Sequence, residues 1–281
     1  MVPKLQCPTC GAEVRAHEKD CPSCASFCWF PNVRKAEEAE EISALEGRYE
    51  VARATALGRD REPVFLAYES ALADSVAVVC RSLDQVKALL SSESAVYISF
   101  YKQRSSGGRR AEDTPIETQR EATDVRVFPS YNEEIRFAAL SLDGKGVSSY
   151  GNCSLVLKSI AIARRATVFW ENAVEFCNRV CPDQTKPIPP GYRAPWPMRA
   201  KLAAAKAEPS LDRHTTHEEF SRILLDGNLF VEVHIYGPLN RNSFERLLIP
   251  KPSGRADQAM VSGIKDVIRK DGLGITVEEY S

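Results

Sequence analysis

The sequence predicts an α+β protein that begins with a small metal-binding module. Three features support this prediction: a cysteine-rich start over residues 1–30, a charged stretch of helical character over residues 31–93, and mixed strand-like and helical segments over residues 94–281. Strands and helices that do not alternate strictly are typical of α+β folds. We therefore expect a zinc ribbon, a helical connector and a larger α+β domain, in that order.

The composition is that of a folded protein with a substantial core. The chain has 281 residues, of which 43% are hydrophobic and 27% charged, with 37 basic and 38 acidic side chains. Because these charges balance, nucleic-acid binding would have to come from local patches. No apolar run approaches the ~18 residues of a membrane span, and the first residues lack the apolar stretch of a secretory signal. We expect a cytoplasmic protein with reduced thiols and no membrane partner.

Four cysteines near the N-terminus have the spacing of a zinc site. They form two Cys-Pro-x-Cys pairs, Cys7 with Cys10 and Cys21 with Cys24. Zn²⁺ prefers four thiolates in a tetrahedron, and two residues between cysteines let one tight turn present both sulfurs. The spacing predicts a closed, structural Zn²⁺ site, with Cys28 as a competing ligand. Whether such a ribbon recognises a partner or only fixes the terminus stays open.

The connector is expected to be helical throughout. Sparse apolar positions over residues 32–60 predict one long helix, and Pro63 suits the first turn of a second helix that continues to Val79. Ser82 is a plausible N-cap for a third helix over residues 83–90.

Beyond residue 94, the β-branched and aromatic runs predict strands. The predicted strands cover residues 95–101, 134–142, 153–157, 229–236 and 246–249. A polar stretch that ends at Asp124 is interpreted as a loop. Thr215 and Glu218 form a capping box ahead of a predicted helix, and a terminal helix is expected over residues 259–269.

The strand at 229–236 carries polar side chains where an apolar strand would be expected. The two-residue repeat of a strand places Glu232, His234 and Tyr236 on one face. A carboxylate within an apolar strand is costly unless it has partners or a task. One interpretation is a solvated strand face; another is a catalytic acid; a nuclease that uses Glu232 and His234 is a third.

This segment, with the Pro238 turn and the apolar strand that returns after it, resembles the final catalytic strand of the ADP-ribosyltransferase fold. The resemblance covers roughly residues 94–281 and implies a split β-sheet domain that uses NAD. It implies that Glu232 stabilises the oxocarbenium-like ribose when nicotinamide departs. Because Phe230 stands where arginine-modifying members carry a second acid, the resemblance favours the single-glutamate toxin type that modifies DNA.

The same resemblance implies further residues of an NAD site. The strand at 95–101 corresponds to the first active-site strand of the fold, which carries Arg or His in the family; here Tyr97, Ser99 or Tyr101 takes that place. Ser149 and Tyr150 correspond to the serine-bearing middle element. The resemblance implies that His234 helps to bind the acceptor and that NAD is bound by Tyr97, Ser99, Ser149 and Tyr150.

Enzymes of this kind commonly act as bacterial toxins or phage-defence effectors, so the resemblance implies a nucleic-acid or protein acceptor and a neutralising antitoxin protein. Basic stretches with aromatic residues at 102–110 and 192–201 suit phosphates and exposed bases.

The glycine-rich phosphate loops, the His-Glu-x-x-His motif and the Gly-x-Ser-x-Gly motif are absent from the sequence. The alternative function is that of a non-catalytic zinc-ribbon adaptor that binds nucleic acid or protein.

Overall fold

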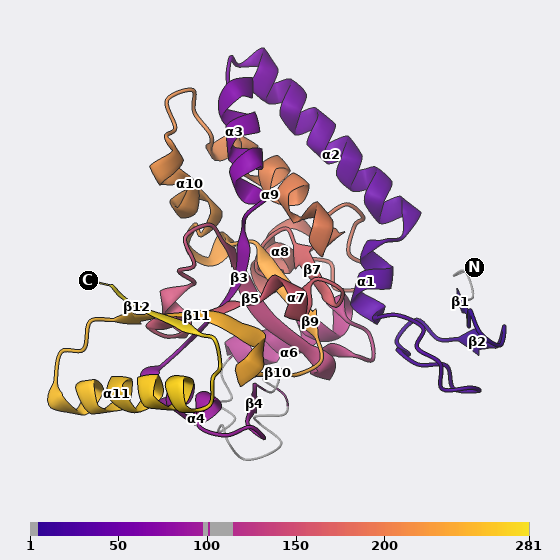
Figure 1. Cartoon of the computed structure of the whole chain (residues 1–281). Helices are drawn as coiled ribbons and strands as arrows, with labels where there is room; N and C mark the ends of the chain where they lie inside the picture. The colour runs from indigo at the N-terminus through magenta and orange to yellow at the C-terminus, as the bar shows by residue number, and fades with distance from the viewer. Residues whose placement is uncertain (1–4, 98–100, 102–114, 281) are drawn as a thin grey trace.

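The computed structural model describes residues 5–97, 101 and 115–280, and its central feature is one large mixed sheet (Figure 1). The 8-stranded sheet has the order β12-β11-β6-β3-β5-β9-β7-β8, and its neighbours are antiparallel except for the parallel pair β11 and β12. Its strands are β3 (Val76–Arg81), β5 (Ile135–Ser141), β6 (Cys153–Leu157), β7 (Ala166–Phe169), β8 (Arg193–Pro195), β9 (Glu232–Tyr236), β11 (Phe244–Pro250) and β12 (Thr276–Tyr280). Two smaller ladders pair β1 (Leu5–Gln6) with β2 (Glu13–Val14), and β4 (Val96–Tyr97) with β10 (Leu239–Asn240).

Helices cover both faces of the large sheet. The α-helices are α1 (Pro31–Ala36), α2 (Ala39–Gly58), α3 (Glu62–Leu72), α4 (Leu83–Leu90), α6 (Pro115–Val127), α7 (Ser159–Ile162), α8 (Ala173–Val180), α9 (Arg199–Ala207), α10 (His217–Leu224) and α11 (Arg255–Lys270). The short 3-10 helices are η1 (Asn132–Glu134), η2 (Ser148–Tyr150), η3 (Trp196–Met198), η4 (Glu208–Ser210), η5 (Gly227–Leu229) and η6 (Arg241–Ser243). Within the described residues, no helix combines the length and the apolar character that crossing a bilayer requires.

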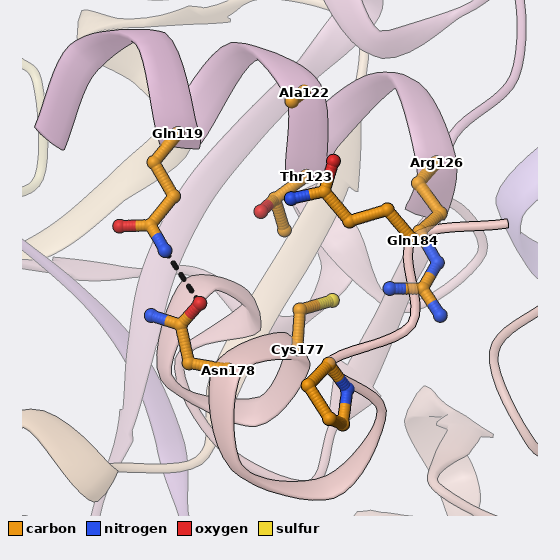
Figure 2. Close-up of a pocket in the computed structure, with 8 residues that line it drawn as sticks. Gln119, Ala122, Thr123, Arg126, Cys177, Asn178 and Gln184 are labelled. Atoms are coloured by element: carbon orange, nitrogen blue, oxygen red, sulfur yellow. Dashed lines mark hydrogen bonds between the residues drawn. The ribbon is translucent and has the colours of Figure 1, made fainter. Parts of the chain in front are cut away.

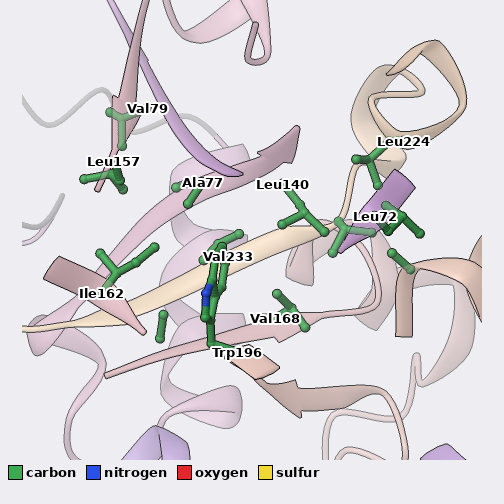
Figure 3. Packing of buried hydrophobic residues seen from close by; sticks show 14 of the residues in the cluster. Leu72, Ala77, Val79, Leu140, Leu157, Ile162, Val168, Trp196, Leu224 and Val233 are labelled. Carbon is green, nitrogen blue, oxygen red and sulfur yellow. The ribbon is translucent and has the colours of Figure 1, made fainter. Parts of the chain in front are cut away.

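The main core lies on one face of the sheet. There Ala77, Leu140 and Val233 of three adjacent strands pack against Leu72 of α3 and against Trp196 (Figure 3). Each such side chain contributes roughly 1.5–3 kcal/mol when it leaves water. The helices α2, α3, α9 and α10 belong to this layer, whereas α6 and α8 pack on the other face around a smaller cluster rich in phenylalanine.

The prediction of a helix as far as Val79 is wrong. Helix α3 ends at Leu72, where the Ser75 hydroxyl donates to the Leu72 carbonyl at 2.6 Å, and residues 76–81 form β3. A short, continuous apolar run fits the end of a helix or a strand buried on both faces equally well. Because β3 pairs with both β5 and β6, it joins the strands into one continuous sheet. The resemblance had implied a split sheet.

Other predictions hold in part. The α+β class is confirmed, and strands form close to the expected positions in β5, β6, β9 and β11. The strand expected at 95–101 is described only as the short β4, and the polar stretch interpreted as a loop contains helix α6. The capping box of α10 uses Thr216 and Glu219, one residue later than expected.

The N-terminal ribbon is attached to the sheet through α1 and the residues before it. The Arg34 guanidinium donates to five carbonyls of the N-terminal region, among them that of Cys28 at 2.6 Å. The Asn32 amide donates to the carbonyls of Arg165 and His234, at 3.0 and 3.2 Å. These bonds fix the ribbon beside the end of β9.

Candidate functional site

The thiols of the two Cys-Pro-x-Cys pairs converge on one point. The four cysteines are Cys7, Cys10, Cys21 and Cys24, and their Sγ atoms all lie within 4.8 Å of one another. Sγ of Cys7 is 3.6 Å from Sγ of Cys24, and the same distance separates Cys10 from Cys21. Thiolates ~2.3 Å from zinc in a tetrahedron lie about 3.8 Å apart. The four cysteines are therefore placed to bind a metal ion, and their spacing fits zinc.

The backbone supports this arrangement in the same way on both loops. The N–H groups of Thr9 and Ser23 point at Sγ of Cys7 and Cys21, each at 3.4 Å. Such contacts favour the thiolate form that a metal requires. Cys28 is outside the group, and its thiol donates instead to a backbone carbonyl at 3.4 Å.

Glu232 lies at the start of β9, in the middle of the sheet, and is only 2% exposed. Its Oε1 accepts a bond from the Arg120 guanidinium at 3.0 Å. Its Oε2 accepts from the backbone N–H of Ala173, the first residue of α8, at 3.1 Å and lies 3.0 Å from His234 Nε2. The carboxylate is thus held by a helix side chain, a helix N-terminus and a neighbour on its own strand.

These contacts set the protonation states. Burial alone would raise the pKa of Glu232, but the Arg120 charge and the bond to His234 outweigh it and lower the pKa to about 2. Burial lowers the pKa of His234, so its imidazole is neutral and Nε2–H donates to Glu232. The centre of the site is therefore an ionised carboxylate at neutral pH, paired with one guanidinium.

Arg120 and Asp124 lie one turn apart on α6 and extend the network. The Arg120 Nε donates to Asp124 at 3.1 Å, and the Tyr101 hydroxyl donates to the same carboxylate at 2.8 Å. The guanidinium carbon of Arg120 also lies 4.0 Å from the centre of the Phe137 ring, within the range of a cation–π contact. Arg120 is 18% exposed, so it forms the edge of the site rather than its floor.

The His234 ring is fixed by aromatic neighbours. The rings of Phe128, Phe137 and Phe169 lie 4.7, 5.5 and 5.5 Å from it. They exclude water from one side of the Glu232 carboxylate, which strengthens its electrostatic contacts.

Tyr150 marks the solvent side of the site. It is 51% exposed, its ring lies 6.3 Å from that of Phe230, and its hydroxyl accepts a bond from Asn172 at 3.4 Å. Burial raises the pKa of Tyr150, and the negative charge of Glu232 raises it further. Asn172 directly precedes Ala173, whose N–H binds Glu232, so the half-exposed Tyr150 ring lies on the same side of the site as the carboxylate.

The structure brings together only part of the predicted set. Glu232, His234 and Tyr150 share one site, and Ser149 is exposed beside Tyr150. Ser99 lies outside the described residues. Tyr97 lies elsewhere: its hydroxyl binds Arg81, and its carbonyl accepts from Arg136, which points away from the Glu232 face of β5.

Three residues of the site were not predicted from the sequence: Arg120, Asp124 and Asn172. The first two lie in the stretch interpreted as a loop; their spacing of four residues with opposite charges is the signal that indicates a helix face there. Asn172 is the N-cap of α8 and accepts from Val174 N at 3.0 Å. An asparagine that precedes an amphipathic run is a recognisable N-cap signal.

Some cations of the two predicted basic stretches are paired with carboxylates and are therefore not available to bind phosphates. The stretch at 102–110 lies outside the described residues. In the stretch at 192–201, Arg193 pairs with Glu41 at 3.1 Å and Lys201 pairs with Glu46 at 2.6 Å, both on α2. These cations hold α2 against the sheet.

A small cavity lies between α6 and α8 (Figure 2). It has a volume of about 90 Å³, and the Gln119 side chain spans it to bind Asn178, beside the Cys177 thiol. Pockets for drug-sized ligands run from about 300 to 1,000 Å³. This cavity is therefore too small for a dinucleotide.

In comparisons with known proteins, no protein-family model and no curated protein matches the chain. The geometry around Glu232 and the motif resemblance therefore carry the functional proposal. The four cysteines are placed to hold a metal ion at a second site, apart from Glu232.

Proposed function

We propose that the protein is an NAD-dependent ADP-ribosyltransferase in which Glu232 is the catalytic carboxylate. The observation that carries the proposal is a buried carboxylate, held ionised by Arg120 and His234, next to the half-exposed Tyr150 ring. Groups whose pKa values are strongly shifted by burial and a specific charge partner are enriched at functional sites.

The reaction needs a fixed negative charge. The bond between ribose C1′ and the nicotinamide nitrogen breaks, its electron pair leaves with nicotinamide, and positive charge develops on the ribose. A carboxylate stabilises that cation more than it stabilises the neutral sugar, which lowers the barrier. An acceptor nucleophile then bonds to C1′ and gives up its proton. Glu232 supplies the charge, and His234 orients the carboxylate through its bond to Oε2.

Substrate access depends on Arg120. Arg120 covers Oε1, whereas Oε2 binds Ala173 and His234, so movement of the Arg120 side chain opens Oε1 to a ribose hydroxyl. Asp124 remains available to the displaced guanidinium. Tyr150, on the open side, offers a ring on which nicotinamide stacks. The acceptor is a nucleic acid or a protein, and the function is that of a bacterial toxin or defence effector that an antitoxin protein neutralises.

The test is incubation of the purified protein with labelled NAD and a cell extract. The wild type is expected to release nicotinamide and to label one fraction, RNA, DNA or protein. The variant Glu232→Gln is expected to do neither, because it lacks the charge. Glu50→Gln, on the exposed side of α2, is the matched control and keeps full activity.

Because Glu232 is buried, a loss of activity in Glu232→Gln has two explanations, the lost charge and misfolding. A second variant, at the solvent-exposed Tyr150, separates them. Tyr150→Leu removes an aromatic ring that is half exposed, so it leaves the fold intact and is expected to raise KM for NAD. Absence of nicotinamide release by the wild type in every extract rules out the proposal. Release that persists in Glu232→Gln shows that another residue carries the chemistry.

The adaptor function remains the second candidate, and one observation favours it. Phe27, on the ribbon, is 43% exposed and lies 5.5 Å from Trp29, over which Arg164 lies at 4.9 Å. One exposed ring and one half-buried ring beside a cation suit the bases and phosphates of a single strand. The adaptor predicts binding of single-stranded RNA that Phe27→Ala weakens, with no NAD consumption; unchanged binding in Phe27→Ala contradicts it.

A further inference from the structure

An open hollow lined by arginines lies in the layer of helices on the other face of the sheet from Glu232. Its volume is about 410 Å³, and its lining residues are Arg59, Arg61, Asp212 and Arg213. Two of them come from the turn between α2 and α3, and two from the loop between η4 and α10. These helices belong to the core layer of Figure 3, so the hollow is separate from the Glu232 site.

Arg61 is a fixed, buried wall of this hollow. Its side chain is 10% exposed, and its guanidinium donates to the Glu208 carboxylate and to the carbonyls of Glu208 and Leu211. Glu208 is itself buried, with a side chain 8% exposed. The carboxylate of Glu208 is therefore already committed to Arg61.

Arg59 and Arg213 have no carboxylate of their own in the part of the chain that the structure describes. Arg59 is 62% exposed and approaches only the Glu208 oxygen that Arg61 already binds, at 3.9 Å. Arg213 donates through Nε to His214 Nε2 at 3.0 Å and is in no ion pair within 4.0 Å. Two carboxylates lie at the hollow: Glu208 is bound to Arg61, and Asp212 accepts from the backbone N–H of His214 at 3.0 Å. Apart from the contact of Glu208 with Arg59 at 3.9 Å, neither carboxylate forms an ion pair with Arg59 or Arg213 in the described part of the chain.

We propose that this arginine hollow binds the phosphoryl group of a small anionic ligand. Arg59 and Arg213 approach the phosphate oxygens from two different loops, and the Arg61–Glu208 ion pair fixes the wall between them. Planar guanidinium groups match phosphate geometry and bind it through charge-assisted bonds. The volume lies within the ~300–1,000 Å³ of small-molecule sites, so the hollow admits free pyrophosphate and a nucleotide alike.

Calorimetric titration with inorganic pyrophosphate at low ionic strength tests the proposal. The wild type is expected to bind at one saturable site. The double variant Arg59→Gln/Arg213→Gln is expected to bind roughly 100-fold more weakly, since each lost charge-assisted contact costs about tenfold. The matched control Arg222→Gln/Arg269→Gln removes the same charge where the side chains are 77% and 82% exposed, and it keeps wild-type affinity.

A parallel titration with ADP distinguishes the two sources of the phosphoryl group. Tighter binding of ADP indicates a nucleotide, and equal or weaker binding indicates free phosphate; either result supports the site. No saturable binding by the wild type overturns the proposal, as does an equal loss in both double variants. If the double variant misfolds, Arg213→Gln alone is expected to lose about tenfold. None of these outcomes depends on NAD chemistry at Glu232.

Discussion

Glu232 gathers its partners from distant parts of the chain. Arg120 lies 112 residues before it and Ala173 lies 59 residues before it, whereas His234 is two positions along the same strand. Glu232 and His234 could be predicted as site residues from the sequence, because polar side chains are unusual in an apolar strand. Arg120 could not be predicted, because no local pattern indicates which strand its helix will face.

The protonation states lead to a prediction about stability and pH. The pKa of Glu232 is lowered to about 2 by Arg120 and His234 against the effect of burial, so its stabilisation is present above the unfolded value of about 4.3 and is lost as the pH falls toward 2. Urea unfolding at several pH values is expected to show a steeper loss below about pH 4.3 in the wild type than in Glu232→Gln. Parallel curves would contradict the ionised state of Glu232.

Gly151 is expected to be the glycine least tolerant of substitution near the site. Its φ is 142°, and an added Cβ would lie 2.2 Å from the carbonyl carbon of Arg81. Gly151→Ala is therefore expected to lower the free energy of unfolding by about 2 kcal/mol or more. Gly58→Ala, where an added Cβ meets nothing within 4 Å, is the control and is expected to leave stability unchanged or slightly higher. Equal midpoints in urea for the two variants would contradict this account.

At the scale of elements, β3 shows where sequence reasoning fails. The patterns of β5, β6, β9 and β11 identify them as strands because apolar and β-branched residues dominate them. In β3 the same kind of run follows a helix after a short turn, and local pattern does not separate a buried strand from a continuing helix. Residues 76–81 form a strand because they pair with β5 and β6, which lie much later in the chain.

Amide hydrogen exchange tests this assignment. As an inner strand, bonded to β5 on one side and to β6 on the other, β3 is expected to exchange only through global unfolding. The amides of the surface helix α10 are expected to exchange faster, through local opening. Exchange of residues 76–81 as fast as that of α10 would show that β3 is not in the sheet centre.

At the scale of the molecule, the cysteine module and the large sheet differ in how far the sequence predicted them. The cysteine spacing predicted the metal site residue by residue, because all four ligands come from one short segment. The α+β class was also predictable, because it depends on local strand and helix patterns. The continuity of the sheet was not predictable, because it depends on the pairing of β3 with strands that are distant in the sequence.

Metal analysis of single-cysteine variants tests the ribbon. The wild type is expected to contain about one zinc per chain, and Cys10→Ser is expected to lose it, because a closed site needs all four thiolates. Cys28→Ser keeps its zinc, since that thiol bonds to a backbone carbonyl instead. Zinc that persists in Cys10→Ser, or that disappears in Cys28→Ser, would contradict the ligand assignment.

The most direct measurement of the central claim compares NAD binding with nicotinamide release in Glu232→Gln. Because the carboxylate acts on the cation and not on the neutral sugar, the variant is expected to bind NAD within about threefold of wild type while release falls by about 100-fold or more. Release at the wild-type rate by a folded variant would contradict the account.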